Sequence, residues 1–219
     1  MRSKLTIVLF FVGVLSLYGG AAMLKEAPAR SYADYEGLQQ VEARRMDAAF
    51  VRPGVKFGVY TALLLEEPEL AFRTPDRSKQ QFPLTEEQKT RFRNLLAQVF
   101  SAELENSEQL RLVDQPGPDV LRLGVRVQDI TATVPPRGVG SVGRASIALD
   151  AVGEATLVLE LRDSQSEETL VRAFDSRAVE GIAIFQKGVP LTSWSDVERL
   201  CERWATIARR GLDDLVGDG

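Results

Sequence analysis

The residues with the clearest chemical pattern are three glycines in the middle of the chain. Gly138, Gly140 and Gly143 form a G-x-G-x-x-G pattern, and Asp163 follows at about the distance of the ribose-binding acid in a dinucleotide fold. That fold needs a strand buried on both faces that runs straight into the loop, and a helix that begins there. Residues 120–134 instead alternate apolar with polar side chains, and two prolines precede the glycines. We therefore expect a loop that crosses the sheet edge and binds no nucleotide.

The remaining candidates for chemistry are few. The chain contains no histidine and one cysteine, Cys201, which excludes histidine-activated nucleophiles and imidazole or multi-thiolate metal sites. Cys201 falls on the apolar side of a predicted helix, so we expect it in the core. Glu66, Glu67 and Glu69 form an acidic cluster, but the spacing of a calcium loop is absent and a solvated edge is expected. The sequence predicts no catalytic, cofactor-binding or metal-binding residue, and a protein that is not an enzyme.

The N-terminus has the pattern of an export signal. Arg2 and Lys4 precede an uncharged run from Leu5 to Leu24, which suits the basic and apolar regions of a secretory signal peptide. The run is also about as long as the ~20 residues that a membrane-spanning helix requires. Residues 1–24 are therefore predicted to be either a cleaved signal peptide or an anchor in the inner membrane. Either outcome places the rest of the chain in the periplasm.

Length and charge restrict the class of protein. A chain of 219 residues, with 44% hydrophobic and 26% charged residues, is long enough for one sizeable core and short for two. The formal net charge is −4 and the arginines are interspersed with acids, so we expect no nucleic acid partner.

Residues 25–54 are polar and contain several prolines and glycines without a sustained period, so we expect an irregular lead-in. Tyr32 and Tyr35 lie within it and are candidates for contact with a partner. Aromatic rings more often anchor a loop on its own domain, and that alternative stays open.

Residues 55–219 are predicted to form a single α+β domain. Alternation predicts extended chain over 55–65, 110–114, 120–134 and 153–162, and a hairpin then returns the chain after Asp163. Apolar stripes at helical spacing predict helices over 84–105 and 192–216. Each begins with a capping-box pattern, Thr85 with Gln88 and Ser195 with Glu198. We expect a mostly antiparallel sheet of about five strands with both helices on one face.

Four stretches taken in order resemble the bacterial envelope proteins of domain-of-unknown-function family 3313: "YADYEGLQ", "FVRPGVKFGVYTALLLEEPEL", "GEATLVLELRDSQSEETL" and "WSDVERLCERWA". The resemblance covers nearly all of the chain after residue 25. It implies a Gram-negative envelope protein, usually a lipoprotein, and it supplies no catalytic residues. The lipid-bearing cysteine of a lipoprotein is missing after the apolar run, where the sequence reads "LSLYGGAA".

Two functions follow from these observations. The first is a non-catalytic envelope component that binds another protein or a membrane-associated assembly, with Tyr32 and Tyr35 as contacts and an open sheet edge as a possible docking site. The second is a periplasmic carrier of a small apolar ligand or lipid, held between the sheet and the helices. A carrier requires an apolar cavity of roughly 300 Å³ or more, which a protein-binding module does not.

Overall fold

The computed structural model describes residues 37–43, 45–73, 83–130, 132–133, 148–149, 155–175, 185–186, 189–190 and 194–218. The chain divides into two compact units, Met1–Tyr35 and Glu36–Gly219. Every described residue belongs to the second unit, and the account below concerns that unit alone.

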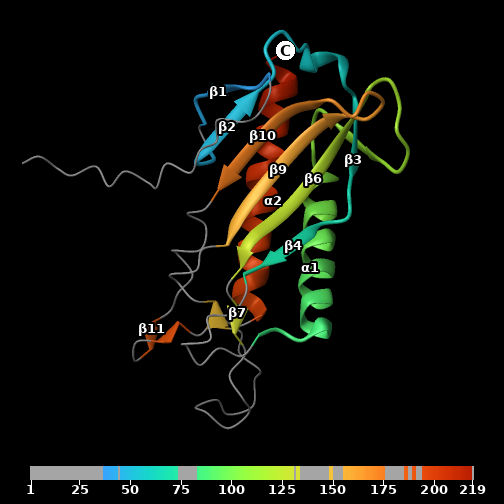
Figure 1. Ribbon diagram of the computed structural model, residues 1–219. Helices are drawn as coiled ribbons and strands as arrows, with labels where there is room; N and C mark the ends of the chain where they lie inside the picture. The colour runs from blue at the N-terminus through green and yellow to red at the C-terminus, as the bar shows by residue number, and fades with distance from the viewer. Residues whose placement is uncertain are drawn as a thin grey trace, which may run out of the picture. The chain divides into compact units, whose positions relative to one another are not determined.

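The second unit is built on one mixed sheet (Figure 1). Its strand order is β1-β2-β10-β9-β6-β3-β5, and a further strand, β4, also pairs with β6. The bounds are β1 Gln39–Val41, β2 Ala48–Val51, β3 Ala62–Leu65, β4 Glu69–Phe72, β5 Arg111–Val113, β6 Val120–Ile130, β9 Thr156–Asp163 and β10 Thr169–Asp175. The α+β class is confirmed. The expectation of a mostly antiparallel sheet of about five strands is wrong, because this sheet has eight strands and β3, β4 and β5 pair in parallel.

The parallel pairs arise from one interrupted strand. β3 pairs with the first half of β6 and β4 with its second half, so both lie along the same edge of β6. Pro68, which has no amide hydrogen to donate, lies in the break between them. The chain then returns through a helix to β5, which lies parallel to β3, as parallel neighbours require a crossover connection.

Two further expectations at the start of the domain are wrong. Residues 25–54 are not irregular throughout, because β1 and β2 belong to the main sheet. Residues 55–61 do not form part of a strand, because a short 3-10 helix, η1, spans Phe57–Val59 and the strand begins only at Ala62. Phe57 and Tyr60 are both buried, and their spacing of three suits this tight helix rather than a strand.

Both long helices lie on the same side of the main sheet, as predicted (Figure 1). They are α1, Glu86–Leu104, and α2, Trp194–Gly217. The predicted capping box of α1 is present: the Gln88 amide donates to Thr85 Oγ1 at 3.2 Å and the Thr85 amide donates to Gln88 Oε1 at 2.8 Å. The capping box expected at Ser195 is wrong, because α2 begins at Trp194 and Ser195 already lies within its first turn.

The core lies between the helices and the facing side of the sheet. Alternate residues of β6 point into it as predicted: Leu121, Leu123, Val125 and Val127 are at most 2% exposed. Trp204 of α2 and Phe100 of α1 are fully buried against this face. The hairpin expected after Asp163 is confirmed by the antiparallel pairing of β9 with β10.

Four two-residue strands form two smaller hairpins. β7, Ala132–Thr133, pairs with β8, Ala148–Leu149, and β11, Phe185–Gln186, pairs with β12, Val189–Pro190. Gly138, Gly140 and Gly143 lie between β7 and β8, outside the described residues. In a dinucleotide fold a helix begins at the glycine loop. Here the described element that follows the glycines is β8, a strand antiparallel to β7.

Candidate functional site

The sheet is wider than the helix layer that covers it. Seven strand positions at ~4.8 Å spacing span about 29 Å, whereas two packed helices of about 10 Å diameter cover about 20 Å. α1 packs beside α2 and β4, and α2 crosses behind the central strands of the sheet (Figure 1). The face formed by β10, β2 and β1 is therefore left with incomplete cover next to α2.

An apolar groove of about 530 Å³ occupies this place, and we name it the α2 groove. Its floor is built from cross-strand neighbours on the helix-facing side of the sheet. One row contains Leu123, Leu161, Val171 and Val51, and the next contains Leu159, Ala173, Ala49 and Val41. Val55, Phe57 and Met46 close its end. Apart from the charged residues of its mouth, every lining side chain is apolar or absent.

The helical wall of the groove is one ridge of α2. Ile207, Gly211 and Leu215 are spaced four residues apart, so they lie on one side of the helix, and all three line the groove. Ile207 and Leu215 are only half-buried, whereas Trp204, Ala208 and Leu212 are buried against the sheet. A Cβ atom added at Gly211 meets no atom within 4 Å. The glycine thus widens the groove at the middle of the ridge.

Charged residues surround the mouth of the groove. Arg45, in the connection between β1 and β2, donates to Asp214 Oδ2 of α2 at 3.0 Å, so one ion pair joins the two walls. The other charged lining residues are Glu42 and Asp218. Both are exposed, and among the described residues neither forms an ion pair. The described residues of the mouth therefore supply one cation and three carboxylates.

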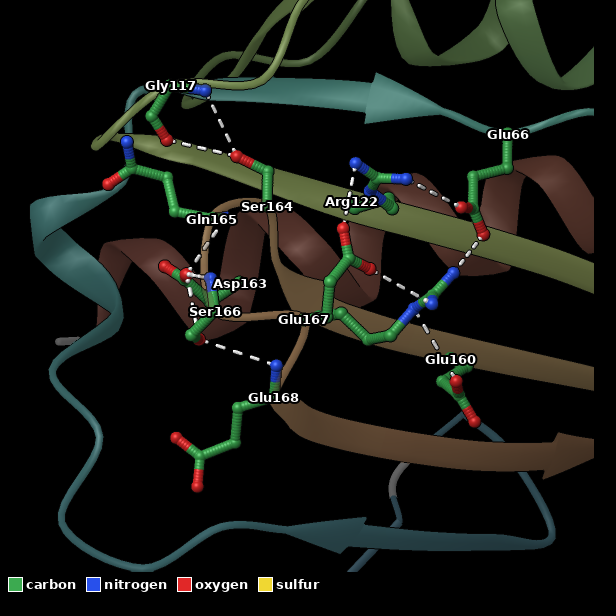
Figure 2. Close-up of polar contacts among 11 residues, drawn as sticks. Glu66, Gly117, Arg122, Glu160, Asp163, Ser164, Gln165, Ser166, Glu167 and Glu168 are labelled. Atoms are coloured by element: carbon green, nitrogen blue, oxygen red, sulfur yellow. Dashed lines mark hydrogen bonds and ion pairs between the residues drawn. The ribbon is translucent and has the colours of Figure 1, made fainter.

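The opposite face of the sheet carries a network of ion pairs (Figure 2). Arg122 of β6 lies 3.4 Å from Glu66 and 2.9 Å from Glu167. Arg162 of β9 also pairs with both acids, and with Glu160, which in turn pairs with Arg172 of β10. These alternating charges compensate one another.

The expectation of a solvated acidic edge is wrong for Glu66, which is mostly buried in this network, and is confirmed for Glu67 and Glu69, whose side chains are 83% and 63% exposed. Glu66 is bound to two arginines, Glu69 to Arg126 at 2.6 Å, and Glu67 lies 4.0 Å from Arg93. Within the described part of the chain, no group of acids or cysteine is placed to hold a metal ion.

Asp163, the candidate ribose-binding acid, organises the turn between β9 and β10 (Figure 2). It accepts hydrogen bonds from the amides of Gln165 and Ser166 at 3.1 and 2.8 Å and from the Tyr60 hydroxyl at 3.0 Å. Partial burial by itself raises the pKa of Asp163, but the hydrogen bonds from Ser166, Tyr60 and Gln165 outweigh it and hold that pKa below its usual value. Burial, together with the bond to Asp163, raises the pKa of Tyr60 to about 12.

Cys201 lies in the core, as predicted. It is fully buried in the face of α2 that meets the sheet, and burial raises the pKa of its thiol to about 12. Such a thiol is protonated at neutral pH and is a poor nucleophile.

The other residues singled out from the sequence lie outside the described part of the chain: Arg2, Lys4, Leu5, Leu24, Tyr32 and Tyr35. Neither described helix is both long and apolar enough to cross a bilayer. The carrier alternative placed a ligand between the sheet and the helices, but the sequence did not indicate which residues form the α2 groove. A signal was present, because the apolar stripe of α2 is broad enough to include Ile207, Gly211 and Leu215, more than one sheet contact can bury.

Comparison with known proteins gives a family and several distant folds. No curated protein matches the chain. The PelC dodecamer from Paraburkholderia phytofirmans is 10% identical, with 81% of this chain and 95% of that chain covered and a TM-score of 0.34. A putative neuraminyllactose-binding hemagglutinin homolog from Helicobacter pylori is 13% identical, with 71% and 82% covered and a TM-score of 0.35. A DUF330 protein from Xanthomonas campestris is 14% identical, with 72% and 82% covered and the same TM-score. Scores this low carry no argument about function.

The family model described as "Protein of unknown function (DUF3313)" matches residues 28–208, and the chain therefore belongs to the DUF3313 family.

Proposed function

We propose that this protein is a non-catalytic binding protein of the bacterial cell envelope, which holds the apolar part of a small ligand or lipid in the α2 groove. One observation carries the proposal: an apolar groove of about 530 Å³ between α2 and the sheet. This volume lies within the range of about 300–1,000 Å³ that is typical of ligand pockets. Between the two functions suggested by the sequence, it favours the carrier.

The lining of the groove supports binding without chemistry. The described residues of the lining include no serine, threonine, tyrosine, cysteine or lysine, so none of them places a nucleophile or general acid along the apolar walls. The carboxylates of the described residues lie at the mouth, where they are exposed to water, and not along the apolar walls. The groove can therefore bury the apolar surface of a ligand, but its described walls supply no reactive group.

The partly exposed walls supply the driving force. Val51, Val171, Leu159 and Leu215 pack on the core but remain half-buried. Covering such side chains stabilises a complex by about 25 cal/mol per Å² of apolar surface removed from water. A contiguous apolar hollow of this kind on a soluble domain often marks a binding site.

A fluorescent apolar probe tests the proposal. N-phenyl-1-naphthylamine, which is uncharged and brightens on leaving water, is titrated into the protein, and its emission is expected to rise to saturation. Gly211→Leu places a side chain in the open space of the groove and should abolish the rise. Gly211→Ala, which adds one methyl group, is the matched control and should retain binding. A probe that binds Gly211→Leu as well as the parent protein would rule out the α2 groove as the site.

A second function, docking of another envelope protein, is favoured by the edge strand β1. β1 ends the strand order of the main sheet, and its three residues are exposed. Among the described residues, no strand covers its outer side, and such an edge accepts a strand from a partner. Crosslinking in intact cells tests this function. Recovery of one specific envelope protein from the parent, and its loss from a Tyr32→Ala, Tyr35→Ala variant, would support docking; a protein that purifies alone with a bound lipid would support the carrier.

A further inference from the structure

The charges at the mouth of the α2 groove indicate which ligands it accepts. We propose that the groove selects amphiphiles with a cationic head group, whose apolar chain lies between α2 and the sheet while the head group lies at the mouth among carboxylates. This inference rests on the proposed function, because it assigns a ligand class to the same groove.

The carboxylates at the mouth outnumber the cations. Among the described residues that line the groove, Arg45 is the single cation, and Asp214 already binds it at 3.0 Å. Glu42 and Asp218 remain on either side of this pair, one on the β1–β2 connection and one at the end of α2. A cationic head group placed there is attracted by both acids. An anionic head group meets two negative charges without an ion-pair partner in the described structure, and the one described cation of the mouth, Arg45, is engaged with Asp214.

The end of α2 adds to this negative field. The C-terminus of a helix carries a partial negative charge, so basic residues are favoured in the last turn. α2 has no basic residue in its last turn, and it carries Asp213 and Asp214 near its end, followed by Asp218. A sequence that departs from a local rule of stability often does so at a functional site.

Contacts within the protein explain the presence of Asp213 and, in part, that of Asp214, but not that of Asp218. Asp213 accepts hydrogen bonds from Ser107 and, at 2.8 Å, from Arg209, and so ties α2 to the end of α1. Asp214 holds the β1–β2 connection through Arg45. Within the described structure, Asp218 has no such contact through its carboxylate, and its position at the mouth is what a cation-binding role requires.

The depth of the groove separates the two parts of the ligand. The floor residues Leu123, Leu161 and Val171 lie on central strands of the sheet, whereas the charged residues lie only in the β1–β2 connection and the last turns of α2. Burying a charged head group on the apolar floor costs several kcal/mol. The ligand can therefore bind in one orientation, with its chain inward and its head group outward.

Displacement of N-phenyl-1-naphthylamine by three amphiphiles of equal chain length tests the inference: decyltrimethylammonium, decanoate and uncharged decyl maltoside, each below its micelle concentration. At low salt we expect the cation to bind about tenfold more tightly than the anion, as two nearby exposed carboxylates allow, with the uncharged compound between them. The difference should narrow in 0.5 M salt, because exposed charges are screened beyond about 4 Å there. Equal affinities, or a preference for decanoate, would overturn the inference while leaving the groove as a binding site.

A charge-neutral variant tests the assignment of residues. Glu42→Gln with Asp218→Asn is expected to remove most of the preference for the cation without changing the affinity for decyl maltoside. A preference that survives in this variant would contradict the assignment. Failure of the parent protein to bind the uncharged probe would instead refute the proposed function itself, and the cation preference with it.

Discussion

Asp163 shows how one carboxylate holds two distant parts of the chain together. It closes the β9–β10 turn through the amides of Gln165 and Ser166 and also binds Tyr60, 103 residues earlier in the chain. A sequence pattern that places an acid about 20 residues after a glycine loop has the form of a nucleotide site. Here the same acid satisfies backbone amides that the turn leaves without partners.

Asp163 predicts a component of acid stability. Its pKa in the folded protein is lowered, so its contribution to the free energy of unfolding is complete above the unfolded value of about 3.9 and is lost as the pH falls through the lower folded value. Asp163→Asn should destabilise the protein at pH 7 and flatten this part of the acid profile. Urea unfolding at a series of pH values measures the free energy of unfolding of parent and variant. Curves of this free energy against pH that run parallel for the two proteins would contradict the expectation.

Cys201 is expected to resist thiol reagents in the native protein. Its side chain is fully buried and its pKa is raised to about 12, so both access and the thiolate fraction are low. Reaction with 5,5′-dithiobis(2-nitrobenzoate) should be negligible in buffer and complete after addition of guanidinium chloride. Rapid reaction under native conditions would show that α2 separates from the sheet.

At the scale of single elements, Gly124 explains how the ion-pair network fits on the sheet. It lies in the middle of β6, where glycine is normally unfavourable, and a Cβ atom there would lie 3.0 Å from Glu66 Oε2. The glycine therefore makes room for the carboxylate that bridges Arg122 and Arg162.

A double-mutant cycle measures the interaction energy between Gly124 and Glu66. Gly124→Ala in the parent displaces Glu66 and offsets the gain of about 0.5–1 kcal/mol that replacing an interior glycine by alanine brings. In a Glu66→Ala background that gain should appear, which gives an interaction energy of about 0.5–1 kcal/mol between the two sites. Additive effects in urea unfolding would show that the contact contributes nothing.

The elements that the sequence predicts are those with long, regular patterns. α1, α2, β6 and β9 each repeat their apolar spacing several times, so their type and inward faces follow from local sequence. β1, β2 and β4 have three or four residues each, and such strands exist only because a partner strand is already in place. Their pairing is set by tertiary contacts, which no local pattern contains.

The α2 groove depends on the width of the sheet, which no local sequence pattern contains. The stripe of Ile207, Gly211 and Leu215 can be seen in the sequence, but it reads as core because a sequence does not state how wide the sheet is. Only the added width of β2 and β1 shows that two helices are too few to cover it. The sequence therefore suggests a ligand between the sheet and the helices, but the residues of the groove follow only from the strand order.

At the scale of the whole molecule, export remains a prediction. Arg2 and Lys4 before the uncharged run from Leu5 to Leu24 predict that the domain is translocated, because basic residues before an apolar run hold the N-terminus in the cytoplasm. A reporter that is active only in the cytoplasm, fused after Gly219, should be silent. Replacing residues 5–24 by a polar linker should restore its signal, and a bright signal from the unaltered fusion would contradict export.

The ion pair between Arg45 and Asp214 joins residues 169 positions apart in the chain, and this separation has a consequence for the order of synthesis. β2 pairs with β10, and the helical wall of the groove belongs to the last helix. A chain emerging N-terminus first therefore makes β1 and β2 long before β10 and α2 exist. The two strands can pair with each other at once, but β2 must wait more than a hundred residues for its other neighbour, β10, and the groove cannot hold a ligand until the last turns of α2 have been added.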